Sequence, residues 1–115
     1  MTLQQLRCVV QTAQRGSFTA AADALDVSQP AVAEQVRMLE RTLGVELFRR
    51  LARGVRPTPA GEALAEHAEV VLARLEDAVR AVADVATARA GSLAFGLFAS
   101  PMAYRIDELV AAKSA

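Results

Sequence analysis

The chain has 115 residues, 53% of them hydrophobic, and its 13 basic and 13 acidic side chains leave no formal net charge. This length fits one small domain with an additional segment, and the composition excludes a chain that is disordered throughout. A single cysteine excludes an internal disulfide, and a single histidine leaves little material for metal binding or catalysis, so neither an enzyme nor a cofactor is expected. No leader peptide opens the chain and no apolar run is long enough to cross a bilayer, so we expect a cytoplasmic protein without membrane contact.

Alanine accounts for 25 residues, whereas aromatic residues make up only 4% of the chain. This composition favours helices over β-sheet cores, so the expected fold class is mainly α. The first predicted helix covers residues 2–14, with Thr2 as its cap and Gly16 as its end. Cys8 falls within the apolar pattern of this helix and is expected to be buried or half-buried.

Two further helices follow in close succession. Ser17 is the expected N-cap of a short helix over residues 18–25, and Ser28 is the expected N-cap of a longer helix over residues 29–43. Only about three residues separate them, so the segment predicts a helix-turn-helix over about residues 18–37. The positions expected to face inward on the longer helix are Val32, Val36, Leu39 and Leu43.

After Gly44 the pattern changes from helical to alternating. A short strand is predicted over residues 45–48, a basic loop over 49–54 and a return strand over 55–56. These elements together predict a β-hairpin wing beside the helix pair.

Positive charge is concentrated in this first half of the chain. Residues 1–60 carry eight arginines against five acidic residues, and six of those arginines lie between positions 37 and 56. Such a local basic patch is the electrostatic footprint that nucleic acid requires, although a solvated surface would look the same in charge alone.

A long helix is predicted over residues 59–89, beginning at Thr58 and Pro59. Its apolar residues alternate in steps of four and three, which is typical of a coiled-coil seam. The favoured interpretation is pairing between two chains, and the alternative is packing on the domain's own core. The seam consists of Leu64, Ala68, Val71, Leu75, Ala78, Val82 and Val85.

The last segment, residues 90–115, has a different pattern. Residues 92–97 predict a strand and residues 105–112 a helix, separated by Pro101. One strand and one helix do not make a domain, so this segment is expected to be the start of a larger unit.

The sequence resembles the N-terminal part of LysR-type transcriptional regulators over about residues 1–90. The matching stretches are Phe18-Thr19-Ala20-Ala21-Ala22, Leu25, Val27-Ser28-Gln29-Pro30-Ala31-Val32, Gln35-Val36, Leu39-Glu40, Leu43-Gly44, Leu47-Phe48, Arg50 and Thr58-Pro59-Ala60-Gly61. The resemblance implies a winged helix-turn-helix DNA-binding domain over residues 1–58, a dimerising linker helix over 59–89 and the truncated start of an effector-binding domain over 90–115. The DNA-contacting positions that it implies are Ser17, Thr19, Ser28, Gln29, Pro30, Ala31, Ala33, Glu34, Arg37, Arg41, Arg50 and Arg53.

Physical chemistry suggests separate roles within this set. Helix N-termini at Ser17 and Ser28 suit backbone phosphates. Gln29 can pair with adenine through two hydrogen bonds, and the apolar residues that follow it can contact a thymine methyl group. Arg37 and Arg41 are expected to touch phosphates. The family resemblance implies that the wing arginine, Arg53, reaches into the minor groove.

Two positions depart from the family pattern. Ala33 stands where a serine is common, which removes a hydroxyl from the expected base-reading face. Glu34 stands where a neutral or basic residue is frequent. Its carboxylate would repel phosphate, accept a hydrogen bond from a cytosine amino group, or pair with a neighbouring arginine such as Arg37.

The function that the resemblance implies is transcriptional regulation by a dimer bound to double-stranded DNA at an inverted-repeat site. The alternative is an interaction module whose coiled-coil helix pairs with longer relatives and antagonises them. No response to a small-molecule effector is expected from the sequence given.

Overall fold

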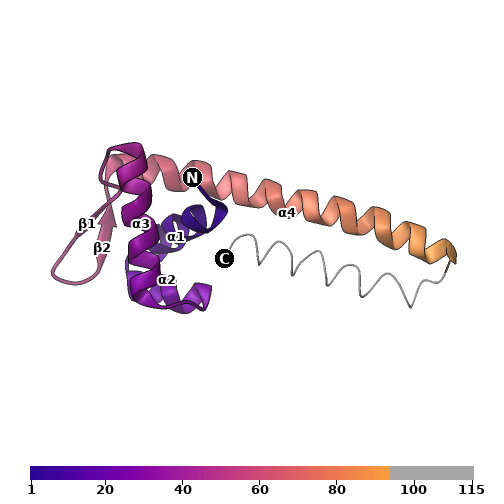
Figure 1. Cartoon of the computed structure of the whole chain (residues 1–115), viewed down its shortest axis with the longest axis horizontal. Helices are drawn as coiled ribbons and strands as arrows, with labels where there is room; N and C mark the ends of the chain where they lie inside the picture. The colour runs from indigo at the N-terminus through magenta and orange to yellow at the C-terminus, as the bar shows by residue number, and fades with distance from the viewer. Residues whose placement is uncertain (94–115) are drawn as a thin grey trace. The chain divides into compact units, whose positions relative to one another are not determined.

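The computed structural model describes residues 1–93 of the chain, with side chains through residue 89. Residues 1–72 form one compact unit, and the long last helix continues into a second. The fold class is confirmed as mainly α, with a winged helix-turn-helix followed by a long helix (Figure 1). The elements are α1 (Leu3–Arg15), α2 (Phe18–Leu25), α3 (Gln29–Leu43), β1 (Phe48–Arg50), β2 (Val55–Pro57) and α4 (Pro59–Leu93).

The first three helices begin at the side-chain caps that the sequence predicts. Thr2, Ser17 and Ser28 each accept a hydrogen bond from the backbone N–H three residues further on, at 3.1, 3.2 and 3.3 Å. Gly16 and Gly44 end α1 and α3 with φ of 68° and 71°, a conformation that costs glycine little. The predicted helix-turn-helix is therefore confirmed.

One core joins α1, α2, α3, the hairpin and the start of α4, and its buried members are Cys8, Val9, Ala21, Ala22, Val32, Val36, Leu39, Leu47, Phe48, Val55 and Ala65. Cys8 is fully buried, as expected, and burial raises the pKa of its thiol from the ordinary 9.0 to about 11. The thiol therefore stays neutral at physiological pH and packs as an apolar group. Leu43 was expected to face inward but is exposed, because it is the last residue of α3 before the chain turns at Gly44.

The first strand of the wing begins later than predicted, at Phe48 rather than at residue 45. The Glu40 carboxylate at the end of α3 accepts hydrogen bonds from the backbone N–H groups of Leu47, at 2.7 Å, and Phe48, at 3.4 Å. These amides are therefore directed at α3 instead of a neighbouring strand, and Val45 is left exposed. The strand prediction over residues 45–48 was wrong for this reason.

Thr58 fixes the other end of the wing and starts α4. Its backbone N–H donates to the carbonyl of Leu47 at 2.9 Å, and its hydroxyl donates to the carbonyl of Glu46 at 2.6 Å. The same hydroxyl accepts from the backbone N–H of Gly61 at 3.1 Å, which caps the helix. The wing and α4 are thus joined through one buried side chain.

Helix α4 extends to Leu93, so the strand predicted over residues 92–97 was wrong at its first two positions. Gly91 does not end the helix, because a glycine inside a helix costs only about 1 kcal/mol relative to alanine. Residues 94–97 and the helix predicted over 105–112 lie outside the described residues.

The predicted seam of α4 divides into two parts. Ala68 is buried with Leu6 and Val10 of α1, and Leu64 packs against the same cluster. For Leu64 and Ala68 the alternative interpretation, packing on the domain's own core, therefore holds. Three later seam residues lie open to solvent in the single chain: Val71, Val82 and Val85 are 46%, 57% and 57% exposed.

We expect Gly61→Ala to destabilise the domain by about 2–3 kcal/mol, because a Cβ at this position would overlap the carbonyl oxygen of Leu47, which Thr58 holds in place. Gly44→Ala is the matched control. Its Cβ meets nothing within 4 Å, so it carries only the left-handed backbone strain of about 1 kcal/mol. Urea unfolding followed by circular dichroism measures both, and equal losses for the two variants would contradict the close-approach argument.

We expect Glu40→Ala to lower the free energy of unfolding by about 1.5–3 kcal/mol, because the amides of Leu47 and Phe48 lose a charged acceptor. Glu46→Ala removes an equal charge from an exposed side chain nearby and serves as the control. Chemical denaturation of the two variants is the measurement. A loss no larger for Glu40→Ala than for Glu46→Ala would show that this carboxylate does not hold the wing.

Candidate nucleic-acid interface

Four of the residues predicted to contact DNA line one shallow hollow. Ser17, Thr19, Gln29 and Arg50 come from the starts of α2 and α3 and from β1, and they surround a depression of about 290 Å³ together with backbone and side chains of the wing loop. Residues far apart in the sequence thus form one surface between the helix-turn-helix and the wing.

The two helix N-termini at this surface have free backbone donors. The Ser17 and Ser28 hydroxyls serve as caps within the protein, and each satisfies one N–H of the first helical turn. The first-turn N–H groups left without a partner in their own helix are those of Phe18 and Thr19 in α2 and of Gln29 in α3, because Pro30 has no N–H. Gln29 and Ala31 are half-buried and Pro30 is exposed, so the start of α3 presents a mixed polar and apolar surface.

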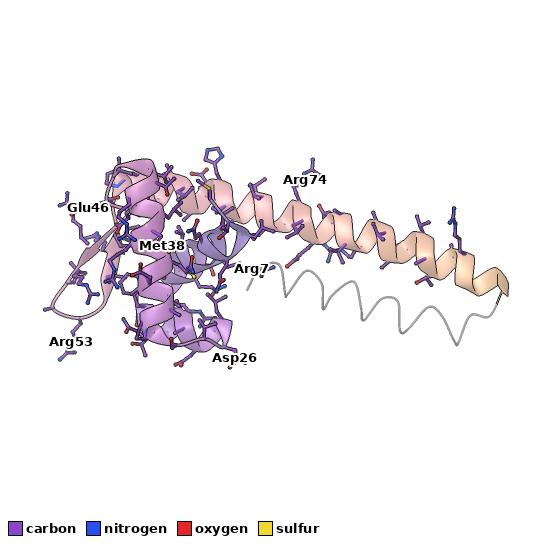
Figure 2. All side chains as sticks on the ribbon, in the orientation of Figure 1. Arg7, Asp26, Met38, Glu46, Arg53 and Arg74 are labelled. Carbon is purple, nitrogen blue, oxygen red and sulfur yellow. The ribbon has the colours of Figure 1, made fainter. Side chains whose placement is uncertain are left out.

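The wing carries a concentration of positive charge. Arg53 lies in the loop between β1 and β2 and points away from the rest of the domain (Figure 2). Arg49 and Arg56 face each other across the two strands, and both are exposed. Like charges directly opposite each other destabilise a hairpin, so the wing carries this pair at a cost in stability.

The turn between α1 and α2 holds the wing in position. The backbone N–H of Val55 donates to the carbonyl of Gly16 at 2.9 Å, and that of Leu51 donates to the carbonyl of Gly54 at 3.0 Å. Gly54 has φ of 77°, and a Cβ there would overlap the carbonyl oxygen of Gly16. The wing thus approaches the helices through backbone atoms that leave no room for a side chain.

Arg50 has a contact that the sequence did not reveal. Its guanidinium lies over the ring of Phe18, 5.6 Å from the ring centre, and Phe18 meets Phe48 edge to face at 6.1 Å. The contact spans 32 positions along the chain, and no local pattern in the sequence indicates it. It orients Arg50 at the edge of the hollow.

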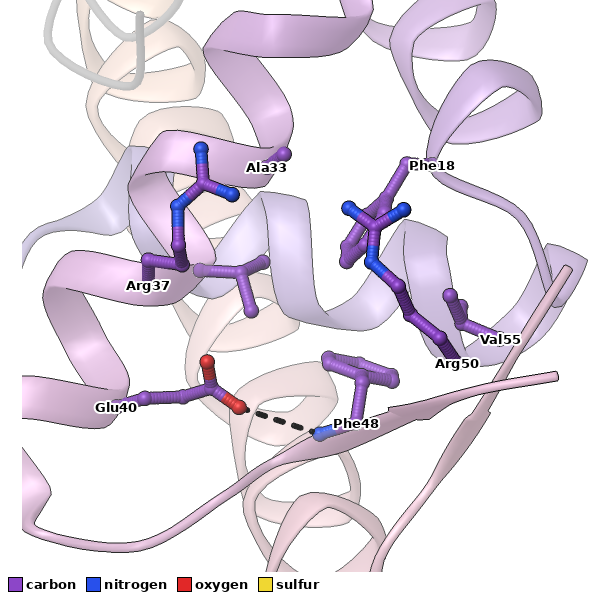
Figure 3. Close-up of a pocket in the computed structure, with 8 residues that line it drawn as sticks. Phe18, Ala33, Arg37, Glu40, Phe48, Arg50 and Val55 are labelled. Carbon is purple, nitrogen blue, oxygen red and sulfur yellow. Dashed lines mark hydrogen bonds between the residues drawn. The ribbon is translucent and has the colours of Figure 1, made fainter.

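A second cavity, of about 190 Å³, lies between α3 and the wing (Figure 3). Arg37 and Arg50 stand on opposite sides of it, and Ala33 lies in its wall. Ala33 is only 4% exposed, so the structure does not bring it to the surface that the sequence assigned to base contacts. The helical period explains this correction, because Ala33 shares the inward face of α3 with Val32 and Val36.

Glu34 pairs with two arginines on the exposed face of α3. Its carboxylate oxygens lie 3.4 Å from Arg37 and 3.3 Å from Arg41. Of the alternatives left open for Glu34, the ion pair with Arg37 is present in the structure, and the second pair, seven residues further on, was not anticipated.

Within residues 1–93, no three histidine, cysteine, aspartate or glutamate side chains gather in a way that would hold a metal ion. No helix in this part of the chain combines the length and apolar character that crossing a membrane requires.

Residues 3–62 match the family model described as the bacterial regulatory helix-turn-helix protein, lysR family. Among curated proteins, the HTH-type transcriptional regulator BudR of Klebsiella aerogenes is 42% identical over 100 residues, which cover 87% of this chain and 70% of that protein. A probable RuBisCO transcriptional regulator of Trichormus variabilis is 39% identical over 109 residues, which cover 95% of this chain but only 32% of that protein.

Solved structures agree with these sequence matches. The BenM DNA-binding domain, crystallised in complex with catB site 1 DNA, superposes with a TM-score of 0.72 at 34% identity, over 76% of this chain and 97% of that one. The CbnR DNA-binding domain in its DNA complex gives a TM-score of 0.64 at 41% identity, over 72% of this chain and 99% of that one. The chain belongs to the LysR family of bacterial regulatory helix-turn-helix proteins.

Proposed function

We propose that the chain is a sequence-specific DNA-binding regulator of transcription that acts as a dimer on an inverted-repeat site in the bacterial cytoplasm. Relatives that match it are named as transcriptional regulators, and two similar domains were crystallised with DNA. We therefore favour regulation over catalysis as its activity.

The observation that carries this proposal is the hollow that joins the starts of α2 and α3 to the wing. It gathers the polar side chains of Ser17, Thr19 and Gln29 beside the Arg50 guanidinium. Free N–H groups, a bidentate amide and a cation are the groups that bind backbone phosphates and base edges of a duplex.

The residues then take separate roles in our proposal. Helix α3 enters the major groove, where Gln29 reads a base and Pro30 and Ala31 contact a thymine methyl group. The exposed wing arginine, Arg53, enters the adjacent minor groove, whose negative potential attracts arginine. Ser17, Thr19 and Ser28 position the backbone, and Arg37, Arg41 and Arg50 supply salt-dependent affinity.

Dimerisation is assigned to the exposed part of the α4 seam. Val71, Val82 and Val85 leave apolar side chains in water in the single chain, and Leu75 and Ala78 lie between them at coiled-coil spacing. Pairing through these residues holds two DNA-binding domains together, which sets the spacing between half-sites.

Selection of bound duplexes from a random-sequence pool at physiological salt should enrich an interrupted inverted repeat.

Gln29→Ala should weaken binding to the enriched duplex roughly 5- to 150-fold and leave binding to a scrambled duplex almost unchanged, because it removes a base contact. Arg53→Ala should weaken binding to both and lower the salt slope by about 1 per domain. Fluorescence anisotropy titrations at several salt concentrations measure these effects.

Arg74→Ala is the control for the loss of a single positive charge, because Arg74 lies on α4 outside the proposed interface. Binding without any enriched sequence would contradict sequence-specific regulation. A folded dimer that binds no DNA would favour the interaction module that antagonises longer relatives.

Val82→Glu should dissociate the dimer, because it places one charge from each chain in the apolar seam. Val70→Glu is the matched control, since Val70 is equally exposed, at 59% against 57%, and lies outside the seam. Sedimentation velocity over a range of protein concentrations gives the dissociation constants. Equal effects of the two variants would reject the seam as the dimer interface.

A further inference from the structure

Three charged side chains form one network on the exposed face of α3. One Glu34 oxygen accepts from Arg37 at 3.4 Å, and the other accepts from Arg41 at 3.3 Å. The side chains are 50%, 52% and 65% exposed, in the order Glu34, Arg37, Arg41. A single carboxylate thus engages both of the arginines on this face.

Stability does not account for this arrangement, because ion pairs between half-exposed side chains contribute little to folding. Its main effect is on the charge of the surface. Arg37 and Arg41 alone would give this face a charge of +2, and the Glu34 carboxylate reduces it to +1. The carboxylate also occupies guanidinium N–H donors that are suited to phosphate oxygens.

The network also lies beside the residues proposed to read bases. Pro30, Glu34, Arg37 and Arg41 are all exposed, and their spacing of four, three and four residues places them on one face of α3. The inward face of the same helix carries Val36 and other core residues. A duplex that meets Pro30 therefore lies along Glu34 as well.

We propose that Glu34 is a specificity-determining positioning residue, an inference that rests on the proposed DNA binding. Glu34 holds Arg37 and Arg41 and so lowers the affinity of the chain for DNA of arbitrary sequence. Binding to arbitrary DNA depends almost entirely on neutralised phosphates, so it is weakened most when two arginines are engaged elsewhere. On the enriched duplex, base contacts hold α3 in the groove, and the two arginines exchange Glu34 for phosphate there. Glu34 therefore lowers the binding affinity less for the enriched duplex than for DNA of any other sequence.

The test is Glu34→Gln, which keeps the size of the side chain and removes its charge. Binding to a scrambled duplex should strengthen roughly three- to tenfold, and the salt slope should steepen by about 1–2 per domain. Affinity for the duplex enriched in the selection should rise by a smaller factor. The ratio of the affinity for the enriched duplex to the affinity for the scrambled duplex should therefore fall. Glu66→Gln on α4 makes the same change of charge at an exposed side chain that forms no ion pair within residues 1–93, and it should change neither the affinity for either duplex nor the salt slope.

A second comparison shows whether Glu34 acts through the arginines. In an Arg37→Gln, Arg41→Gln background, Glu34→Gln should lose most of its effect on the salt slope, as a thermodynamic cycle would measure. Circular dichroism checks that all variants keep their helix content.

Each other outcome overturns the proposal in a recognisable way. If Glu34→Gln weakens binding to the enriched duplex and leaves the salt slope unchanged, Glu34 reads a cytosine amino group instead. If it behaves like Glu66→Gln on both duplexes, the network is a solvated surface. If the unaltered chain binds neither duplex, the proposed DNA-binding function fails, and this proposal fails with it.

Discussion

The geometry of the interface depends on the hydrogen bonds that the Glu40 carboxylate accepts from the backbone of Leu47 and Phe48. The wing has two strands of only three residues each, and so short a hairpin has little stability of its own in water. Its position is therefore set by what holds its ends. Glu40 holds the entry to the wing against the end of α3, and Thr58 ties the exit to the same backbone segment.

The far side of the wing is held against the turn between α1 and α2 by backbone contacts, in addition to the buried side chain of Val55. The backbone N–H of Val55 donates to the carbonyl of Gly16, and Gly54 comes so close to that carbonyl that a Cβ at position 54 would overlap it. Because Gly16 also ends α1, the turn that leads into α2 and the wing are fixed to each other. This explains why Arg50 can lie over Phe18, the first residue of α2. The hollow of the proposed interface is a consequence of these attachments.

The sequence predicts those parts of the fold that local chemistry determines. The start of α2 and both bounds of α3 follow from the Ser17 and Ser28 caps and from Gly44, since each signal acts within a few residues. Tertiary contacts determined the rest. The start of β1 depends on a carboxylate eight positions earlier, and the burial of Ala68 depends on α1. Ala33 was misplaced for a different reason, because resemblance assigned it to the base-reading surface whereas the helical period places it inward.

Electrostatics links the fold of the interface to its proposed use. The chain has no net charge, yet six of its twelve arginines lie on α3 and the wing, and Arg49 lies opposite Arg56, where a charge pair of opposite sign would stabilise the hairpin. The apolar side chains of Phe48 and Val55, buried beneath the hairpin, offset that repulsion. On α3, by contrast, the Glu34 carboxylate neutralises part of the positive charge of Arg37 and Arg41. In the proposed function, the positive charge of the wing attracts DNA, and the partly neutralised charge of α3 leaves discrimination to the residues of α3 that read bases.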